Sequence, residues 1–253
     1  MTATAFGWWK VSDSRTYLSL IIPVYNEAEA ITSVLEEATR VLDGLPQPYE
    51  VLVINDGSTD KTAGVLAYAQ EGMPNLRVFT ITPNSGQSAA FGVGFRECRG
   101  QIAVLMDGDG QNDPHDIPAL LDALHDSDVC CGYRASRRDT WSKRVGSRLA
   151  NAARRCLLHD GIKDTGCSLK AIKAKYLRDL PMSLRGMHRF LPALLLMCGA
   201  KVAQVPVNHR PRSAGRSKYT NLGRLTETVW DLCAVRWMQQ RYRRFCIAEQ
   251  EAS

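Results

Sequence analysis

The chain of 253 residues contains no long apolar run, no secretory leader pattern and no CxxC cysteine motif. Its longest nearly apolar run covers the eleven residues 190–200 and includes a proline, whereas a membrane-spanning helix needs about 20 residues. Residues 1–15 lack a cationic stretch followed by an apolar one, which argues against secretion. Glycine and proline total 30 residues, too few for a collagen-like or disordered chain. We expect the eight cysteines to be reduced, mostly buried thiols in a cytoplasmic protein.

Acidic residues are scarce in the second half of the chain. Residues 1–133 carry 7 Lys/Arg and 18 Asp/Glu, a net charge of −11, whereas residues 134–253 carry 25 and 8, a net charge of +17. This asymmetry predicts an anionic partner for the second half. The basic half lacks a zinc-ligand pattern, an RNP-like aromatic string and a basic zipper, so we expect no nucleic-acid partner. A phosphorylated substrate or an anionic membrane surface remains.

Short apolar runs alternate with helical patterns in the first half. Strands are predicted over residues 18–24, 51–54, 76–81, 102–106 and 129–132, with helices between them, the first over residues 28–42. In the second half, helices are predicted over residues 142–158 and 186–199, the latter interrupted near its start by Pro192. Such alternation favours an α/β fold, with a mainly parallel sheet covered by helices on both faces. Ligands of these folds bind beyond the carboxyl ends of the strands. The loops that follow the strands are therefore the places to look for a site.

Three of these loops carry polar side chains that could do chemistry. Asp107 and Asp109 follow a buried strand, and two carboxylates at this spacing can reach one hard cation such as Mg²⁺ or Mn²⁺. Asp56 follows another strand and could hydrogen-bond a nucleotide base or ribose. The string PVYNE at 23–27 follows the first strand. Taken singly, each loop could also be an ordinary turn with a helix cap.

Taken together, the strings IPVYNE, NDGSTDKT and MDGDGQNDP resemble the family 2 inverting glycosyltransferases with the GT-A fold. GYR at 132–134, DTGCSLK at 164–170, GMHRFLPAL at 186–194 and HRPRSAGRSKY at 209–219 extend the resemblance. The set is most similar to the polyprenyl-phosphate sugar transferases related to dolichol-phosphate mannose synthase. The resemblance implies an N-terminal extension over 1–17, a GT-A domain over 18–220 and a C-terminal amphipathic basic helix over 221–253.

The same resemblance implies a donor site and a metal site. The nucleotide-sugar donor would be bound by Pro23, Tyr25, Glu27 and Asp56, with its diphosphate clamped by Arg212 and Lys218. The Mg²⁺ or Mn²⁺ would be held by Asp107, Asp109 and Gln111. A divalent cation there would stabilise the charge that develops on the leaving nucleoside diphosphate, which gives Asp109 a catalytic role.

The acceptor implied by the resemblance is a polyprenyl (undecaprenyl or dolichyl) phosphate. Its phosphate would be bound by Arg134, Arg144 and Ser147, since the arginine fork binds phosphate oxygens in pairs. Arg148 competes with Arg144 in this register, and a solvated helix face is an alternative. Asp164 would be the catalytic residue beside the reacting sugar, either orienting the acceptor or acting as a base, with an Asx-turn as its alternative.

Many bacterial relatives continue into transmembrane helices, whereas this sequence carries one amphipathic segment over 222–245. Trp230 and Trp237 lie in it, with arginines clustered toward its end. Aromatic and arginine side chains on one helix suit an anionic membrane interface, although packing on the domain or on a membrane subunit would give the same pattern. We therefore expect peripheral association with the cytoplasmic face of a membrane.

The predicted function is metal-assisted transfer of a sugar, with inversion, from a nucleotide sugar to a polyprenyl phosphate. Transfer to a hydroxyl acceptor in lipid or cell-surface glycan synthesis is the alternative, and it would make a base at Asp164 indispensable. The third possibility is a non-catalytic nucleotide-sugar-binding subunit. Both carboxylates of the acidic loop, Asp107 and Asp109, are present, which counts against it.

Overall fold

The computed structural model describes residues 17–135, 154–211 and 221–243. The strands are β1 (Leu18–Val24), β2 (Tyr49–Asn55), β3 (Leu76–Thr80), β4 (Ile102–Leu105), β5 (Val129–Arg134), β6 (Lys170–Lys173) and β7 (Val202–Val207). The helices are α1 (Ile31–Asp43), α2 (Thr62–Gly72), α3 (Gln87–Glu97), α4 (Ile117–Asp122), α6 (Leu191–Met197) and α7 (Asn221–Arg241). Three short 3₁₀ helices complete the description: η1 (Pro114–Asp116), η2 (Ala174–Tyr176) and η3 (Met187–Phe190).

The seven strands form one sheet in the order β3-β2-β1-β4-β6-β5-β7. Every pairing is parallel except those of β6, which runs antiparallel to both β4 and β5. All strands but β6 therefore end at one edge of the sheet, called the carboxyl edge below, and β6 begins there. The predicted mainly parallel sheet is confirmed. β6 was not predicted, because the four residues KAIK form no apolar run.

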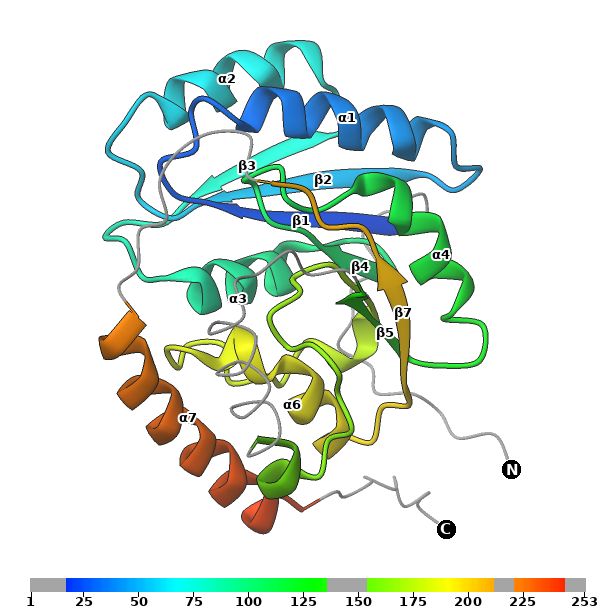
Figure 1. Ribbon diagram of the computed structural model, residues 1–253. Helices are drawn as coiled ribbons and strands as arrows, with labels where there is room; N and C mark the ends of the chain where they lie inside the picture. The colour runs from blue at the N-terminus through cyan, green and yellow to red at the C-terminus, as the bar shows by residue number, and fades with distance from the viewer. Residues whose placement is uncertain (1–16, 136–153, 212–220, 244–253) are drawn as a thin grey trace, which may run out of the picture.

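Side-chain alternation along the strands divides the core into two layers. In β1, Leu20 and Ile22 pack into the cluster that includes α1 and α4, whereas Ile21 packs into the cluster that includes α3 and α6. Figure 1 shows the corresponding arrangement, with α1 and α2 above the sheet and α3, α6 and α7 below it. The helices thus cover both faces, as expected for a sheet whose strands are apolar on both sides.

The first predicted helix begins at Ile31 rather than at residue 28, because Ala30 and Ile31 both donate backbone hydrogen bonds to Glu27 in a preceding turn. The predicted interruption of the helix over 186–199 is observed as a division into η3 and α6, with Pro192 in the first turn of α6. Of the helix predicted over 142–158, only residues 154–158 are described, and they are helical.

Within the described residues, no helix is both long and apolar enough to traverse a membrane. Seven of the cysteines lie in these ranges, and their thiols are free. Four of these are buried: Cys98, Cys130, Cys131 and Cys167. Burial raises the pKa of the Cys98 and Cys130 thiols to about 12, so these side chains behave as small apolar core residues.

Candidate active site

The loops after β1 and β2 are tied together at the carboxyl edge. Asn26 has a left-handed backbone with φ 54°. Its Oδ1 accepts a hydrogen bond from the backbone N–H of Thr59 at 2.7 Å, and its own N–H donates to Ser58 Oγ at 2.9 Å. The N–H of Glu27 donates to Thr62 Oγ1 at 2.9 Å. These bonds fix the segment that carries Pro23, Tyr25 and Glu27, all three partly exposed.

Asp56 organises the loop after β3. Its carboxylate is only 4% exposed and accepts hydrogen bonds from Asn84 Nδ2 at 2.9 Å and from the backbone N–H groups of Ser85 and Gly86, both at 2.8 Å. Gly57 follows with φ +68°, and a Cβ there would stand 2.9 Å from the backbone nitrogen of Asn84. Asp56 therefore holds the turn into α3, and a contact with a nucleotide stays a prediction.

The acidic loop follows β4 at the same edge. Asp107 is half-buried and accepts a hydrogen bond from Gln87 Nε2 at 2.8 Å, while its backbone N–H donates to Asn112 Oδ1 at 2.9 Å. Asp109 is 7% exposed, and one of its oxygens accepts the N–H of Gln111 at 3.1 Å. The loop thus brings both carboxylates to the end of a buried strand, as the sequence predicted.

The carboxylates of Asp107 and Asp109 repel each other. Burial raises the pKa of Asp107, and repulsion by Asp109 adds to the shift, although hydrogen bonds from Ser168 and Gln87 and the charge of Lys170 oppose it. A divalent cation between the two carboxylates would remove that repulsion. The oxygen donors are also the type that Mg²⁺ and Mn²⁺ prefer. The residues present therefore fit the predicted metal.

Arg134 and Asp164 form a bidentate ion pair. Arg134 Nε donates to Asp164 Oδ2 at 2.7 Å and Nη2 donates to Oδ1 at 2.9 Å, and each side chain is 11% exposed. Oδ1 also accepts the N–H of Gly166 at 3.1 Å. A Cβ at Gly166 would stand 2.7 Å from Arg134 Nη2, so glycine permits the close approach. The sequence predicted a role for each residue but not their pairing.

A hydrogen bond between a serine and a histidine joins α3 to η3. Ser88 Oγ and His188 Nδ1 are 2.8 Å apart, and the backbone N–H of His188 donates to the same Oγ at 3.2 Å. Ser88 is buried, with 3% of its surface exposed. This contact could not be predicted from the sequence, because 100 residues separate the two side chains.

A cluster of charged side chains beside the acidic loop was not predicted. Ligand atoms of Glu37, Asp113 and His115 lie within 4.8 Å of one another. Arg210 already pairs with both carboxylates, through Nη1 to Glu37 at 2.9 Å and Nη2 to Asp113 at 2.8 Å. A guanidinium therefore holds the place that a cation would take in this cluster, which is distinct from the Asp107–Asp109 pair.

The structure brings most of the predicted site residues to the carboxyl edge. Those in described segments are Pro23, Tyr25, Glu27, Asp56, Asp107, Asp109, Gln111, Arg134 and Asp164. The side-chain amide nitrogen of Gln111 is 3.4 Å from His209 Nε2 and 3.5 Å from the carbonyl oxygen of Arg210. Four predicted residues lie outside the described residues: Arg144, Ser147, Arg212 and Lys218.

The family model for glycosyl transferase family 2 matches residues 19–180, which include β1 to β6, the acidic loop and Asp164. This chain belongs to glycosyl transferase family 2. The match confirms the family suggested by the sequence strings. This chain is therefore an enzyme that transfers a glycosyl group.

Named relatives of this glycosyltransferase transfer sugars to prenyl phosphates. It is 31% identical over 227 residues to an undecaprenyl-phosphate 4-deoxy-4-formamido-L-arabinose transferase of Edwardsiella ictaluri, covering 88% of this chain and 69% of the relative. It is 32% identical over 233 residues to a dodecaprenyl-phosphate galacturonate synthase of Rhizobium johnstonii, covering 89% of this chain and 68% of the relative. The chain thus spans about two thirds of their length.

A solved structure shows that the fold of this glycosyltransferase is GT-A. Glucosyl-3-phosphoglycerate synthase from Mycobacterium tuberculosis, crystallised with Mn²⁺, uridine diphosphate and phosphoglyceric acid, superposes with a TM-score of 0.66 at 21% identity. The match covers 96% of this chain and 86% of that one. The predicted α/β GT-A fold is confirmed.

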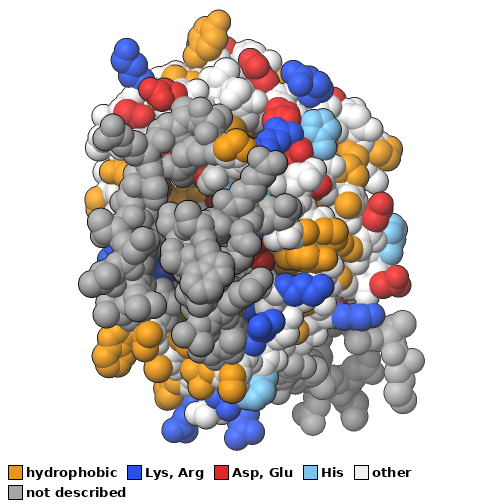
Figure 2. Space-filling view, viewed as in Figure 1, with side chains coloured by type: hydrophobic (Ala, Val, Ile, Leu, Met, Phe, Trp, Pro, Cys, Tyr) orange, Lys and Arg blue, Asp and Glu red, His pale blue; other side chains and the backbone are white. Residues whose placement is uncertain are grey.

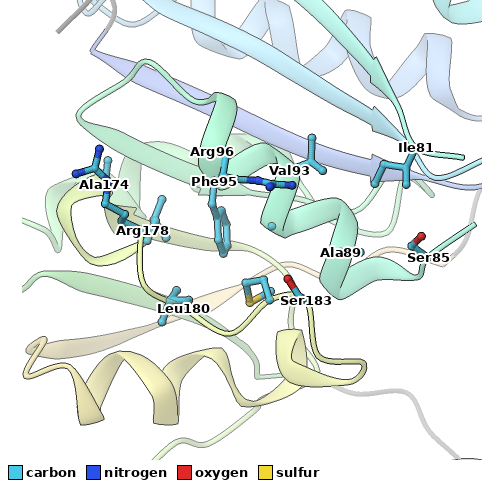
Figure 3. Close-up of a pocket in the computed structure, with 13 residues that line it drawn as sticks. Ile81, Ser85, Ala89, Val93, Phe95, Arg96, Ala174, Arg178, Leu180 and Ser183 are labelled. Atoms are coloured by element: carbon cyan, nitrogen blue, oxygen red, sulfur yellow. The ribbon is translucent and has the colours of Figure 1, made fainter. Parts of the chain in front are cut away.

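The glycosyltransferase also has a half-open cavity of about 620 Å³ on the α3 side of the sheet. It runs along α3 from Ser85, beside the Asp56 loop, to Arg96 and Arg178 (Figure 3). Its walls are polar and apolar in about equal parts, with Phe95 and Leu180 among the apolar side chains. None of the predicted site residues in the described segments lines this cavity, so it lies beside that part of the candidate site rather than in it.

Proposed function

We propose that this glycosyltransferase moves a sugar from a nucleotide-sugar donor to a polyprenyl phosphate, with inversion and with the help of a divalent metal. The observation that carries the proposal is the presence of two charge arrangements at one sheet edge. Asp107 and Asp109 repel each other, and such a pair of carboxylates can bind a cation. Arg134 is held in place by Asp164, and an arginine in this arrangement can bind a phosphate. The names of the two curated relatives point to the same acceptor class.

The donor half of the site is built on the loops after β1, β2 and β4. Pro23, Tyr25, Glu27 and Asp56 bind the nucleotide in this proposal, with Arg212 and Lys218 on its diphosphate. Asp107, Asp109 and Gln111 would hold Mg²⁺ or Mn²⁺. The bound cation would neutralise charge on the leaving nucleoside diphosphate, which is the largest electrostatic demand of the reaction.

The acceptor half is built around Arg134, together with Arg144 and Ser147. A phosphate oxygen of the acceptor attacks the anomeric carbon from the side opposite the leaving group. The bond from that carbon to the diphosphate oxygen breaks, and its electron pair leaves with the nucleoside diphosphate, so the configuration inverts. A phosphate monoester has a second pKa near 6 and is largely ionised at neutral pH. It therefore needs no strong base.

Asp164 acts through Arg134 in this mechanism. Both of its oxygens accept hydrogen bonds from the Arg134 guanidinium. A carboxylate that is engaged by a guanidinium is a weak base, because protonation would break the ion pair. Asp164 therefore orients the arginine that receives the acceptor phosphate. This assignment favours a phosphate acceptor over a hydroxyl acceptor, which would need its proton removed.

We propose that α7 brings the enzyme to the membrane surface where its lipid acceptor lies. Val235 is fully buried against the core, and Leu232 and Met238 pack beside it. On the outward side, Trp230 is 76% exposed and Trp237 is 61% exposed. Figure 2 shows hydrophobic side chains over this helix at the lower left, with Lys and Arg side chains below them.

An aromatic face beside arginines supports peripheral binding to an anionic membrane surface. Arg241 and Arg243 are exposed at the end of α7. Each basic residue near such a surface contributes about 1 kcal/mol, and tryptophan favours the headgroup region. We propose the cytoplasmic face, where the free thiols of the chain would stay reduced. Docking of the same face on a separate membrane subunit is the alternative outcome.

The test is direct transfer by the purified protein. It is incubated with Mn²⁺, a short polyprenyl phosphate and a panel of radiolabelled nucleotide sugars, and label is extracted into butanol. We expect butanol-extractable label with at least one sugar nucleotide, and its loss when EDTA is added. Alkaline phosphatase treatment of the acceptor, which leaves only the alcohol, should abolish the product. Equal transfer to the alcohol would overturn the assignment of a phosphate acceptor.

A further inference from the structure

The chain that follows β7 lies directly against the acidic loop. The backbone N–H of Arg210 donates to the carbonyl oxygen of Gln111 at 3.0 Å, and His209 forms an isolated antiparallel bridge with Asn112. The N–H of Asn208 donates to Asp116 Oδ2 at 2.7 Å. Residues 208–210 therefore form a short strap along the residues that immediately follow Asp109.

Arg210 fastens this strap at two further points. Its Nη1 lies 2.9 Å from both carboxylate oxygens of Glu37 on α1, and its Nη2 lies 2.8 Å from Asp113 Oδ1 in the acidic loop. The side chains are 37% exposed for Arg210, 28% for Glu37 and 11% for Asp113. One guanidinium thus joins three segments that are remote in sequence, with a different nitrogen on each carboxylate.

The hydrogen bonds have the expected effect on the titrating groups. The bond to Glu37 is the main reason that the pKa of Arg210 is raised. Burial alone would raise the pKa of Asp113, but hydrogen bonds from His115 and Arg210 outweigh it and lower that pKa. The raised pKa keeps the Arg210 guanidinium positively charged where it lies between the carboxylates of Glu37 and Asp113.

We propose that Arg210 is a positioning residue that fixes the strap of residues 208–210 to the acidic loop and so sets the affinity for the diphosphate of the donor. The inference rests on the proposed function. Two effects act together. Arg210 holds the backbone of Gln111 and the side chain of Asp113 on the flank of Asp109, and it also neutralises two carboxylates that would otherwise repel a diphosphate.

The geometry explains why Arg210 itself is not assigned to the diphosphate. Its fork is already shared between Glu37 and Asp113. Arg212, for which the family resemblance implies a diphosphate contact, follows two residues later. Arg210 therefore fixes residues 208–210 against the acidic loop, and a direct contact with the diphosphate is not part of its role.

The test measures binding of inorganic pyrophosphate in the presence of Mn²⁺ by isothermal titration calorimetry, which requires neither the correct base nor the correct sugar. Four variants of the full chain are compared with the wild type: Arg210→Met, Arg210→Lys, Glu37→Gln and the double variant Glu37→Gln/Arg210→Met. Glu36→Gln is the matched control, because Glu36 is the exposed neighbour of Glu37 on the same helix. Melting temperatures are recorded for all variants.

We expect Arg210→Met to weaken pyrophosphate binding about ten-fold, as removal of a charged hydrogen bond commonly does. Arg210→Lys should restore part of the loss, and Glu37→Gln should weaken binding by a smaller factor. In the Arg210→Met background, Glu37→Gln should weaken binding no further and should recover part of the loss, because it removes a carboxylate that Arg210 no longer neutralises. In steady-state assays, the KM for the nucleotide sugar should rise while kcat and the KM for the lipid acceptor change little.

Wild-type affinity in Arg210→Met would overturn the inference and leave the proposed function intact. Additive effects of Glu37→Gln and Arg210→Met would overturn it too, because they would show that Glu37 acts independently. An equal loss in Glu36→Gln would reduce the effect to general surface charge and would also overturn it. A wild-type protein that binds no pyrophosphate with Mn²⁺ would overturn the proposed function and, with it, the claim about affinity.

Discussion

Carboxylates are buried at both edges of the sheet, but those at one edge are surrounded by hydrogen-bond donors and those at the other repel each other. At the amino edge, Glu50 is 5% exposed and accepts hydrogen bonds from Ser19 Oγ at 2.6 Å, from the N–H of Arg99 at 2.6 Å and from Arg77 Nη1 at 2.7 Å. At the carboxyl edge, Asp107 lies near Asp109, and burial and their repulsion raise its pKa.

The difference distinguishes a carboxylate with a structural role from a pair for which we propose a role in metal binding. Every strong donor around Glu50 comes from the fold itself, so the ion pair is complete within the chain. The carboxylates of Asp107 and Asp109 repel each other, and Lys170, Ser168 and Gln87 offset this repulsion only in part. Unrelieved repulsion of this kind is expected at a site where a bound ligand supplies the opposite charge.

The largest effect is expected at Asp109. Asp109→Asn keeps the side-chain shape and an oxygen that can accept the Gln111 N–H, so the domain should still fold. Loss of one metal-binding carboxylate should lower kcat by about 10²–10³-fold, since electrostatic stabilisation of the leaving group contributes several kcal/mol. Sugar transfer to polyprenyl phosphate at saturating Mn²⁺ measures the effect.

Circular dichroism and the melting temperature provide the control for Asp109→Asn. Removal of one charge from a repelling pair should leave the metal-free protein at least as stable as the wild type. In the wild type, Mn²⁺ should raise the melting temperature, and in the variant this rise should shrink. Wild-type transfer rates in Asp109→Asn, or full activity in EDTA, would refute the metal assignment.

The second largest effect is expected at the Arg134–Asp164 pair. Arg134→Ala should raise the KM for polyprenyl phosphate by about 10–100-fold, because hydrogen bonds to charged groups are worth about 1.5–3 kcal/mol. Arg134→Lys should recover only part of this loss. The KM for the nucleotide sugar should change little. Steady-state kinetics with each substrate varied in turn measures the split.

Asp164→Asn separates an orienting role from a base role. If Asp164 orients Arg134, the change should raise the KM for the lipid phosphate, and its effect should largely vanish in an Arg134→Lys background. If Asp164 is a base, the change should instead lower kcat in both backgrounds. The wild-type pH–rate profile should then have an acidic limb, where protonation of the base lowers the rate, and the variant should lose that limb. That second result would favour a hydroxyl acceptor.

A purely structural effect is expected at Glu50. Glu50→Gln leaves an amide NH₂ facing donors from Ser19, Arg77 or Arg99, so at least one buried hydrogen bond is lost. We expect a loss of about 1–3 kcal/mol in the free energy of unfolding, measured by urea denaturation, with kcat and both KM values unchanged. An altered KM would show that the amino edge also serves the site.

Much of this contrast could be predicted from the sequence because it is local. Apolar runs ending in Asp or Asn gave the strands and the three loops, and the spacing of Asp107 and Asp109 gave the carboxylate pair. Each of these features lies within a few residues of chain. Strand periodicity and residue chemistry are then sufficient to place them at one edge.

Contacts between remote segments could not be predicted in this way. Arg210 and Glu37 are 173 residues apart, and each alone resembles an ordinary surface charge. Arg134 meets Asp164 because β6 runs antiparallel beside β5, and β6 has too few apolar residues to be recognised as a strand. The missing information is the order of strands, which depends on packing across the whole domain.

The smallest effect in the purified enzyme, and the one that tests the outer surface, is expected on α7. Trp230→Ser/Trp237→Ser changes two side chains that are 76% and 61% exposed, so the fold should lose little stability. Binding to vesicles of anionic phospholipid should fall several-fold, because the contribution of the two tryptophans is lost while the charges of the helix remain.

Tyr68→Ser is the matched control, since Tyr68 is 78% exposed on α2, across the sheet from α7. Salt should release the wild type only partly and the double variant fully, because ionic attraction is screened and apolar burial is not. If both proteins sediment equally with the vesicles, the tryptophan face serves another surface, such as a membrane subunit, and attraction to lipid comes from charge alone.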